Sequence, residues 1–356
     1  TLEWEALIPL LGPAAAALAR YDGMLTAVPN PDLLLSPLTT QEAVLSSRIE
    51  GTQATMGEVL EFEAGQEAAS PERRDDIREV LNYRAAMHKA ERLLAKLPLS
   101  QRVIREMHKV LLSGVRGQHK APGEYRKIPN WIGPPCCTIE QARFVPIDAA
   151  KLPGAMDAWE RYLHTGAPDR LVQLAILHAE FEALHPFLDG NGRLGRMLVP
   201  LFLWRSGLIQ RPMFYISAYL EARRDEYYDR LLGVSRDDDW TGWCRFFIKA
   251  VRAQAEENLA RTRAVLNLHD ELKHRLPEMT RSQYAVRALD WIFARPIFRA
   301  PDFIDAAGIP GPTARRFLGV LRREGVLTDL RPGRGRRAAV LAFPDLLNIV
   351  EGREVF

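Results

Sequence analysis

The sequence has few cysteines and no long hydrophobic run, and both absences narrow what the chain can be. Its three cysteines, Cys136, Cys137 and Cys244, show no C-x-x-C spacing, which argues against a disulfide framework and against a zinc site. No apolar run reaches the roughly 18 residues that a membrane-spanning helix needs. The run from Met197 to Trp204, for example, has eight residues between two arginines. These absences argue against a transmembrane protein.

The first residues also lack the features of a secretory signal. The segment Thr1 to Glu5 is acidic and has neither a basic start nor an apolar stretch, so we expect a cytoplasmic protein. The 356 residues are 47% hydrophobic and 26% charged, which is enough apolar material for packed cores and argues against general disorder. A chain of this length is expected to form two or three domains.

Basic residues are unevenly distributed, although 48 basic and 45 acidic residues give a net charge of only +3. The segment from Thr313 to Arg337 has eight arginines against two acidic residues, a net charge of +6, while the remainder has 40 basic against 43 acidic residues. The basic character therefore belongs to the C-terminal part of the chain, where it favours an acidic partner.

Apolar residues recur at spacings of three and four along most of the chain, which predicts an all-α protein. A break at Leu276-Pro277-Glu278 follows a polar helix that includes Arg252 to Lys273, and it predicts a domain boundary near residue 275. We therefore expect a helical N-terminal region over residues 1–75, a helical core over 76–275 and a C-terminal module over 276–356.

One stretch departs from this helical pattern. The segment from Gln118 to Ile147 has five prolines and two glycines around two short β-like patches, near Trp131-Ile132 and near Arg143 to Val145. Such a composition predicts an irregular hairpin inserted between helices.

The segment from His185 to Arg196, HPFLDGNGRLGR, is the most informative in the chain. Apolar residues and His178, which we interpret as a packed core residue, form one helical face that ends at His185. The helical period restarts at Leu194, and Pro186 and the glycines interrupt it. The pattern predicts a tight helix, loop, helix turn.

The start of the second helix of this turn has the chemistry of an anion site. Its first residues expose backbone N–H groups with little side-chain bulk, and the helix dipole adds partial positive charge; these residues are Gly190, Asn191 and Gly192. Arg193 and Arg196 lie three apart in the first turn, where both can bind phosphate oxygens. Two arginines beside such a cradle favour a polyphosphate ligand.

Two further residues of the turn have the chemistry needed for catalysis. Asp189 offers a hard oxygen ligand beside the cradle, and such a carboxylate commonly holds a Mg²⁺ ion that also binds phosphates. His185 can accept a proton from an attacking hydroxyl group near neutral pH. The turn therefore predicts a base, a metal ligand and a phosphate site within twelve residues.

The same segment resembles the H-x-F-x-x-G-N-G-R-x-x-R signature of Fic-domain proteins, with every specified position filled. The resemblance implies a Fic helical core and the transfer of AMP from ATP to a protein hydroxyl. It implies His185 as the general base and Asp189 as the magnesium ligand. It also implies nucleotide binding by the rest of the segment, namely Gly190, Asn191, Gly192, Arg193, Leu194, Gly195 and Arg196.

The resemblance extends to other parts of the chain. The predicted hairpin resembles the family's flap, with Ile132 and Gly133 beside the nucleotide and extended backbone available to pair with a target segment. Tyr227 and Tyr228 resemble the family's adenosine-side pair. An alternative for these tyrosines is packing against the core.

An earlier segment resembles an inhibitory element. Thr39 to Glu42 is interpreted as a capping box that opens a short helix closed by Gly51. Within that helix Ser46 and Glu50 share a face, and together with Gly51 they resemble the inhibitory [S/T]-x-x-x-E-[G/N] motif of Fic proteins. The resemblance implies that Glu50 pairs with Arg196 and prevents productive binding of the γ-phosphate.

The C-terminal module resembles a winged helix. We predict helices over Arg281 to Phe293, Pro301 to Ala307 and Pro312 to Glu324, followed by two strand-like runs around a basic loop. The third helix and the loop would contact DNA phosphates through Arg315, Arg316, Arg334, Arg336 and Arg337. Binding to a protein instead is left open.

The function predicted from these features is ATP-dependent and Mg²⁺-dependent transfer of AMP to a Ser, Thr or Tyr hydroxyl of a target protein, with inhibition by Glu50. One alternative is removal of AMP from a modified protein, with Glu50 orienting water. Another is a DNA-binding regulator that uses the Fic core as a nucleotide sensor. The expected partners are a protein substrate, including the chain itself, and DNA; a homodimer is left open.

Overall fold

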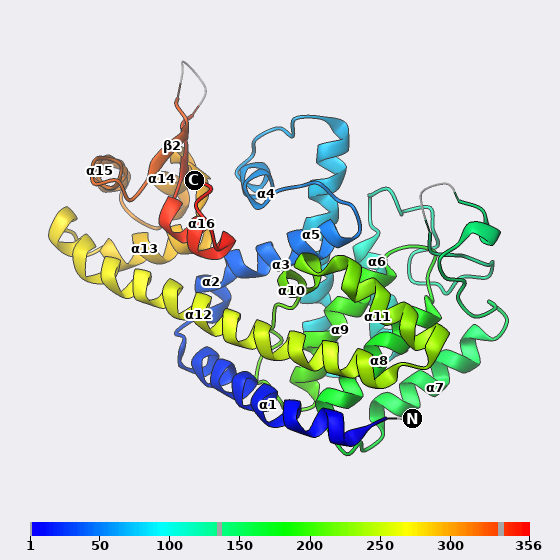
Figure 1. Ribbon diagram of the computed structural model, residues 1–356. Helices are drawn as coiled ribbons and strands as arrows, with labels where there is room; N and C mark the ends of the chain where they lie inside the picture. The colour runs from blue at the N-terminus through cyan, green and yellow to red at the C-terminus, as the bar shows by residue number, and fades with distance from the viewer. Residues whose placement is uncertain (1, 134–136, 334–337) are drawn as a thin grey trace. The chain divides into compact units, whose positions relative to one another are not determined.

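The computed structural model describes residues 2–133, 137–333 and 338–356, and it is mostly helical (Figure 1). Cys136 and three of the predicted DNA contacts, Arg334, Arg336 and Arg337, lie outside the described residues. No helix in the described part of the chain combines the length and the apolar character that crossing a membrane requires.

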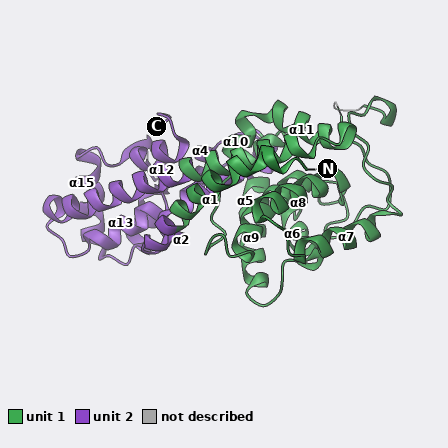
Figure 2. Ribbon diagram, turned by 60° about the horizontal axis from the view of Figure 1, so that its bottom comes forward, with its two compact units in different colours: residues 1–22, 45–52, 78–256 green, residues 23–44, 53–77, 257–356 purple. Residues whose placement is uncertain are grey.

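The chain forms two compact units (Figure 2). Unit 1 consists of residues 1–22, 45–52 and 78–256, and unit 2 consists of residues 23–44, 53–77 and 257–356. These units are built from interleaved segments, so they differ from a division into three consecutive domains. The boundaries at residues 75 and 275 remain a prediction.

Unit 1 is a bundle of helices around a central pair, α8 (Arg170–Leu184) and α9 (Asn191–Arg205). Helix α8 packs against α9, α7 and α11, and α6 packs against α9. The other helices that lie wholly in unit 1 are α6 (Gln101–Leu111), α7 (Leu152–His164), α10 (Ser217–Ala222) and α11 (Arg224–Asp237). Helices α1 (Trp4–Ala27), α5 (Pro71–Leu94) and α12 (Trp240–Thr280) contribute most or part of their length to it.

The predicted helix, loop, helix turn is confirmed by α8 and α9. Asp169 caps the start of α8 by accepting hydrogen bonds from the N–H groups of Leu171 and Val172, which stabilises the first turn. Helix α8 ends at Leu184, where His185 adopts a left-handed backbone conformation, and α9 begins after Gly190 with φ of 78°. Both helices bury an apolar face, and His178 is buried between them as predicted.

The predicted hairpin is present in a minimal form. Ile132 and Phe144 form an isolated antiparallel bridge, in which the Ile132 N–H donates to the Phe144 carbonyl at 2.9 Å. A short 3-10 helix, Ile139–Gln141, lies between them. Among the described residues of this segment the pairing is limited to that bridge.

The capping box predicted at Thr39 to Glu42 is wrong. Helix α3 (Ser36–Ile49) starts three residues earlier, so Thr40 lies within it and donates its hydroxyl to the Ser36 carbonyl. Pro37 explains the earlier start, because proline is favourable in the first turn of a helix. A capping box is found instead on α4 (Met56–Glu63), between Thr55 and Glu58.

The break predicted at Leu276-Pro277-Glu278 is also wrong, because α12 continues to Thr280 with Pro277 in its last turn. The helix ends where Arg281 adopts a positive φ of 48°. Proline near the end of a helix removes only one backbone hydrogen bond, and the packing of the helix can offset that loss. Leu276 is buried and accepts a hydrogen bond from the Thr280 hydroxyl.

The described residues of the C-terminal module, 276–333 and 338–356, contain three antiparallel strands in the order β1, β3, β2. In the register of the sheet, Ala342 lies opposite both Ile297 and Thr328. The strands are β1 (Ile297–Arg299), β2 (Thr328–Arg331) and β3 (Val340–Ala342), and the helices are α13 (Ala285–Ala294), α14 (Ala300–Ala306), α15 (Gly311–Arg323) and α16 (Pro344–Glu351). The three predicted helices are present, whereas β1 and α16 were not predicted.

The remaining elements of unit 2 are short. Helix α2 (Pro31–Leu34) packs against α13, and α4 packs against β1. The core of the C-terminal module is aromatic, with Trp291 in edge-to-face contact with Phe298 and Phe303 at centroid distances of 4.9 and 5.2 Å. Such contacts stabilise a small module beyond the area that they bury.

Candidate active site

The catalytic histidine predicted from the sequence lies at the end of α8, on the wall of a cavity. His185 is the C-cap of the helix, with φ of 46° and ψ of 60°. Its Nδ1 atom lies 3.4 Å from the Glu182 carbonyl, although that contact depends on which tautomer is present. The side chain is half-buried and lines the cavity.

Electrostatics keep this histidine neutral. Burial and, to a smaller extent, the charge of Arg126 lower the pKa of His185, while the Glu182 carbonyl, Glu50 and Asp189 act in the opposite direction; the net pKa is about 4. A neutral imidazole can accept a proton at physiological pH. The ring is therefore in the protonation state that a general base needs.

The cavity has a volume of about 620 Å³ and lies within unit 1. It is bounded by α8, the start of α9, α11, the end of α3 and the hairpin. Its lining residues include His185 and also Glu50, Ile132, Gly133, Glu182, Gly192, Arg196 and Tyr228. A cavity of this size is typical of sites for nucleotide-sized ligands.

The start of α9 forms the floor of this cavity. The Asn191 side chain accepts a hydrogen bond from the Phe187 N–H and donates one to the Phe187 carbonyl, both at 2.8 Å. This side chain therefore closes the loop, so its contribution to an anion cradle is its backbone N–H. At Gly192 a Cβ atom would lie 2.2 Å from Glu50 Oε1, so only glycine leaves room for the carboxylate at the helix N-terminus.

Arg196 is fully buried and is held by the segment predicted to be inhibitory. Its Nη2 atom lies 2.6 Å from Glu50 Oε1 and also donates to the Ser46 carbonyl, while Nε donates to the Ser46 hydroxyl at 2.8 Å. The pairing of Glu50 with Arg196 that the resemblance implied is thus present. Burial opposes the charge of both groups, but their attraction raises the pKa of Arg196 and lowers that of Glu50. Both are therefore charged. Gly51, which follows with φ of 98°, ends the motif.

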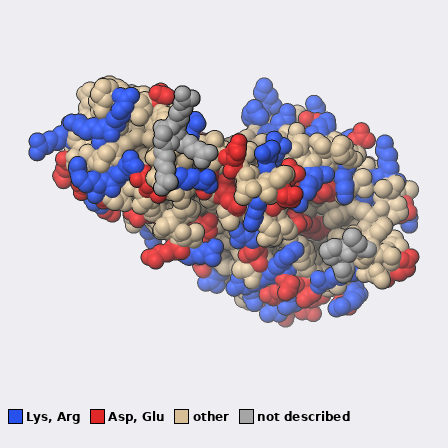
Figure 3. Space-filling model, turned by 90° about the horizontal axis from the view of Figure 1, so that it is seen from above, with Lys and Arg blue, Asp and Glu red and all other residues tan. Residues whose placement is uncertain are grey.

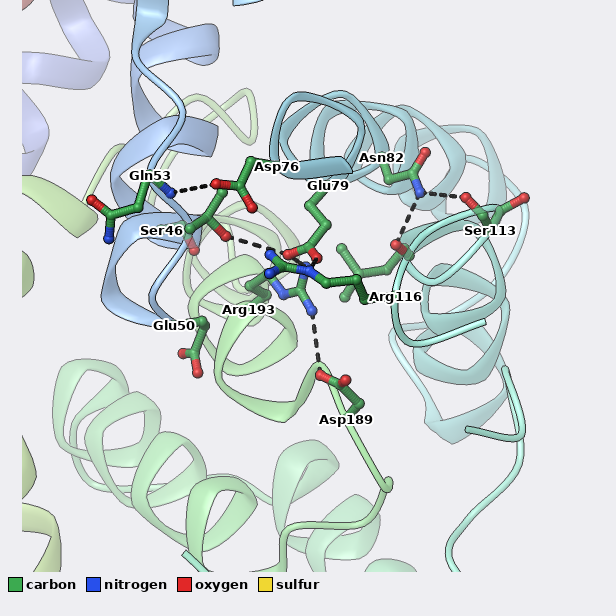
Figure 4. Close-up of polar contacts among 12 residues, drawn as sticks. Ser46, Glu50, Gln53, Asp76, Glu79, Asn82, Ser113, Arg116, Asp189 and Arg193 are labelled. Atoms are coloured by element: carbon green, nitrogen blue, oxygen red, sulfur yellow. Dashed lines mark hydrogen bonds and ion pairs between the residues drawn. The ribbon is translucent and has the colours of Figure 1, made fainter. Parts of the chain in front are cut away.

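Arg193 belongs to a second ionic cluster, with Glu79 and Asp189 (Figure 4). Its Nη1 atom lies 3.0 Å from Glu79 Oε2, and its Nη2 atom lies 3.4 Å from Asp189 Oδ1. Glu79 also accepts hydrogen bonds from Arg116 Nε at 2.9 Å and from the Thr52 hydroxyl at 3.3 Å. Glu79 therefore joins the first motif arginine to the residue that follows the inhibitory motif.

The Asp189 carboxylate is suited to hold one metal ion together with other ligands. About a third of its side chain is exposed, and its contact with Arg193 Nη2 leaves further oxygen lone pairs for a cation. No group of three or more His, Cys, Asp or Glu side chains in the described residues is placed to hold a metal. Mg²⁺ in phosphate sites is commonly held by one or two carboxylates, the phosphates and water, so the donor set fits such an ion.

The two predicted adenosine-side tyrosines differ in position. Tyr228 lines the cavity, whereas Tyr227 is fully buried, with its hydroxyl 2.9 Å from His178 Nε2. Of this pair, Tyr227 fits the packing alternative and Tyr228 fits the predicted binding role. Ile132 and Gly133 of the hairpin line the cavity as well, while Leu194 and Gly195 are buried and are not among its lining residues.

Two parts of the chain match known protein family domains. Residues 8–92 match the N-terminal domain of the Fic/DOC family, and residues 98–203 match the Fic/DOC family domain itself. Together these matches cover more than half of the chain. The chain belongs to the Fic/DOC family.

Curated relatives of this Fic protein carry the name protein adenylyltransferase Fic. The protein from Drosophila ananassae is 25% identical over 241 residues, which are 66% of this chain and 43% of that protein. The protein from Drosophila virilis is 27% identical over 205 residues, which are 56% of this chain and 38% of that protein. The chain thus spans less than half the length of these relatives.

Solved structures share the fold at low sequence identity. A Fic family protein from Desulfovibrio desulfuricans G20 matches with a TM-score of 0.61 and 20% identity, covering 96% of this chain and 97% of that one. A Fic domain containing signalling protein from Bacteroides thetaiotaomicron VPI-5482 matches with a TM-score of 0.58 and 19% identity, covering 72% of this chain and 97% of that one. These likenesses establish the Fic fold.

Two residues of the Fic site were not predicted from the sequence. Glu79 lies on α5 at helical spacing from the buried residues Asp76 and Tyr83, and this spacing is the signal that could have placed it on an inward face. Glu182 lines the cavity with its Oε1 buried and without a hydrogen-bond partner in the described residues. Burial raises the pKa of Glu182 to about 8, against the attraction of Arg196 and with the repulsion of Glu50, so it is protonated at neutral pH.

The predicted DNA contacts that the structure describes lie on α15. Arg315 and Arg316 are exposed, and Arg316 Nη2 donates to the Thr280 carbonyl at 2.9 Å. Figure 3 shows Lys and Arg side chains over much of the surface of the C-terminal module, with acidic side chains between them. Several of these arginines pair with acidic residues, as Arg331 does with Glu61 at 2.6 Å.

Proposed function

We propose that this Fic protein transfers AMP from ATP to a Ser, Thr or Tyr hydroxyl of a target protein. The observation that carries the proposal is the placement of a neutral His185 and a buried Arg196 on one cavity at the N-terminus of α9. The base and the anion site face the same space, as transfer at a phosphate requires. The name of the curated relatives supports the same activity.

In this proposal the start of α9 and its arginines bind the phosphates. Backbone N–H groups at the helix N-terminus and the helix dipole stabilise negative charge that develops on the transferred phosphate. Asp189 would hold a Mg²⁺ ion, which would supply charge neutralisation at the phosphates. His185 accepts the proton of the attacking hydroxyl, and pyrophosphate leaves in line.

The hairpin and α11 form the remaining walls. Ile132 and Gly133 would lie against the nucleotide on one side and Tyr228 on the other, because all three line the cavity. The backbone around the Ile132 to Phe144 bridge is extended, so it can pair with a segment of the target protein. Such pairing would place the target hydroxyl beside His185.

Glu50 is proposed to inhibit this reaction. Its carboxylate occupies Arg196 and lies against Gly192 at the helix N-terminus, where the phosphates of ATP would bind. A negatively charged side chain at that position competes with a phosphate group for the same partners. Removing the carboxylate is therefore expected to raise AMP transfer.

The deciding experiment is incubation of the wild-type protein and the variants Glu50→Gly and Glu50→Gly/His185→Ala with radiolabelled ATP and Mg²⁺. We expect weak labelling of the wild type, strong labelling of Glu50→Gly, first seen as self-modification, and none of the double variant. Labelling of the double variant would show that incorporation of the label does not depend on His185. No labelling of any variant with added candidate substrates would contradict the proposed function.

Removal of AMP from a modified protein is a second candidate for the same site. It is favoured by the position of the Glu50 carboxylate in the cavity, where it can orient a water molecule. The two reactions respond oppositely to one change. Glu50→Gly raises AMP transfer if Glu50 inhibits, and it abolishes release of AMP from a pre-modified target if Glu50 orients the water.

The C-terminal module is proposed to bind DNA, as a winged helix would. Support comes from the exposed Arg315 and Arg316 on α15 and from the net charge of +6 between residues 313 and 337. A gel-shift titration of the full chain at low salt tests this role. Failure to shift any DNA would favour a protein partner for the module. It would also contradict the alternative of a DNA-binding regulator that uses the Fic core as a nucleotide sensor.

A further inference from the structure

The catalytic histidine has a backbone conformation that needs support. His185 has φ of 46° and ψ of 60°, in the left-handed region. This region is unfavourable for a residue with a Cβ atom, so surrounding contacts must hold it. Its N–H group donates to the Phe181 carbonyl at 3.1 Å, which fixes one side of the residue.

The carbonyl side is fixed by a single residue at the root of the hairpin, Arg126. Arg126 is 3% exposed, and its Nε donates to the His185 carbonyl at 3.0 Å. Its Nη2 atom lies 3.4 Å from the Leu184 carbonyl, and its backbone N–H donates to the Pro186 carbonyl at 2.9 Å. Three successive carbonyls at the end of α8 thus accept hydrogen bonds from one residue.

Arg126 also joins the two ends of the hairpin. Its Nη2 donates to the Ile147 carbonyl, and its Nη1 lies 3.5 Å from the Ile128 carbonyl. The guanidinium group therefore connects both sides of the hairpin root to the end of α8. Its fork of donors matches several carbonyls at once, which a lysine cannot reproduce.

The charge of Arg126 acts on the imidazole as well. A cation at a helix C-terminus is favourable for the helix dipole, and at this short range it disfavours protonation of His185. The other charged groups that act on the ring are Glu50 and Asp189, which favour protonation, while burial disfavours it most. Arg126 therefore acts on both the geometry and the protonation of the base.

We propose that Arg126 is a positioning residue for the reaction: it fixes the left-handed backbone of His185 and holds the base and the hairpin root in one geometry. The inference rests on the proposed function, in which His185 is the general base and the hairpin presents the target. Arg126 itself need not touch substrate for this role, because it acts through the backbone of His185.

The test compares Arg126→Lys, Arg126→Gln and the control Arg105→Gln, each in the Glu50→Gly background. Arg105 is an exposed control arginine that contacts the same segment, because its Nε donates to the Gly123 carbonyl at 2.7 Å without a contact to α8 in the described hydrogen bonds. For each variant we would measure kcat and KM for AMP transfer and the thermal midpoint. NMR titration of the His185 imidazole, done in the wild-type and single-variant proteins, gives a readout that needs no activity.

For Arg126→Lys we expect kcat to fall about 100-fold, because loss of the fork misplaces the base, with KM for ATP changed less than threefold and the imidazole pKa still low. For Arg126→Gln we expect the same fall in kcat, together with only a small rise of the His185 pKa above about 4, because burial, the main cause of the low value, remains. Arg105→Gln should match its parent in all three measurements.

Two results would overturn the inference. One is a kcat of Arg126→Lys equal to that of the Arg105→Gln control, whether or not Arg126→Gln folds. The other is a kcat of a folded Arg126→Gln equal to that of the Glu50→Gly parent. If instead the Glu50→Gly parent itself shows no AMP transfer, the proposed function fails, while the NMR titration still tests whether Arg126 controls the ionisation of His185.

Discussion

Arginines were predicted to be functional in two regions, α9 and the C-terminal module, and the structure places them in opposite surroundings. On α9 the side chains of Arg193 and Arg196 are 5% and 1% exposed, and each is held by a carboxylate. In the C-terminal module the predicted contacts Arg315 and Arg316 are exposed. Two neighbouring arginines that were not predicted contacts, Arg322 and Arg331, are 39% and 56% exposed in their pairs with Asp329 and Glu61. The same residue type thus has two different energetic roles.

The difference teaches that charge density along a sequence does not measure how strongly the charges act. A buried ion pair is costly to break, because the remaining charge has no water around it. An exposed pair contributes little, since solvent and salt screen it. The cluster on α9 is therefore expected to control catalysis and stability, and the denser cluster at the C-terminus is expected to act only through long-range attraction to a partner.

The largest effect is expected for His185→Ala. The variant should lose AMP transfer by about 1,000-fold, the range that a general base supplies, while ATP binding measured by calorimetry changes little. The phosphate-binding groups on α9 remain intact, which explains why binding survives. Equal rates of AMP transfer for the variant and the parent would show that His185 is not the general base of the reaction.

The comparison of buried and exposed ion pairs is sharpened by a matched pair of amide substitutions. Glu79→Gln leaves Arg193 buried without its main counter-charge, and we expect it to lower the free energy of unfolding by about 3 kcal/mol. Asp329→Asn removes the partner of the exposed Arg322 and should lower it by less than about 1 kcal/mol. Urea unfolding of both variants gives the two values; similar losses would contradict the assigned difference.

A third prediction concerns acid. Burial lowers the pKa of His108 to about 4, and the same cause acts on His178 and His185. Since the unfolded chain binds protons near pH 6.5 and the folded chain does not, stability is complete above pH 6.5 and falls between pH 6.5 and 4. The expected slope is about 1.4 kcal/mol per pH unit for each such histidine.

The control for this prediction is His108→Gln. The Nδ1 atom of His108 accepts a hydrogen bond from the Gly123 N–H, and its Nε2 donates one to the Asp189 carbonyl, whereas glutamine cannot titrate. Thermal midpoints of the variant should fall less steeply with acid than those of the wild type. Parallel curves of thermal midpoint against pH for the two proteins would show that His108 does not contribute to the loss of stability in acid.

The smallest effect is expected in the C-terminal module. Replacing both Arg315 and Arg316 by alanine should weaken DNA binding about tenfold at low salt and reduce the salt slope by about 2. Arg322→Ala should have less effect, because Asp329 already neutralises that arginine. Gel-shift titrations at several salt concentrations test this. A larger loss of DNA affinity for Arg322→Ala than for the double variant would contradict the assignment of Arg315 and Arg316 as the DNA contacts.

Much of the fold and the centre of the site could be predicted from the sequence, because the information is local. The turn from α8 to α9 follows from helical spacing interrupted by Pro186 and glycines, and the positions of His185 and Arg196 follow from it. Helix ends were less predictable: Thr39 to Glu42 has the composition of a capping box but lies inside α3, and Pro277 lies inside α12. The start of α3 follows the local preference of Pro37 for a first turn, whereas packing offsets the loss of a hydrogen bond at Pro277.

The sequence by itself determined which chemical groups stand together on one helix turn, since residues a few positions apart must be neighbours in space. Only the tertiary structure decided the partners of those groups: Glu79 for Arg193, and Arg126 for the backbone of His185. The physical reason is that these partners come from segments about 60 to 110 residues away, and no local pattern specifies a contact across that separation. Burial then sets how strongly each contact acts, and burial is a property of the folded chain.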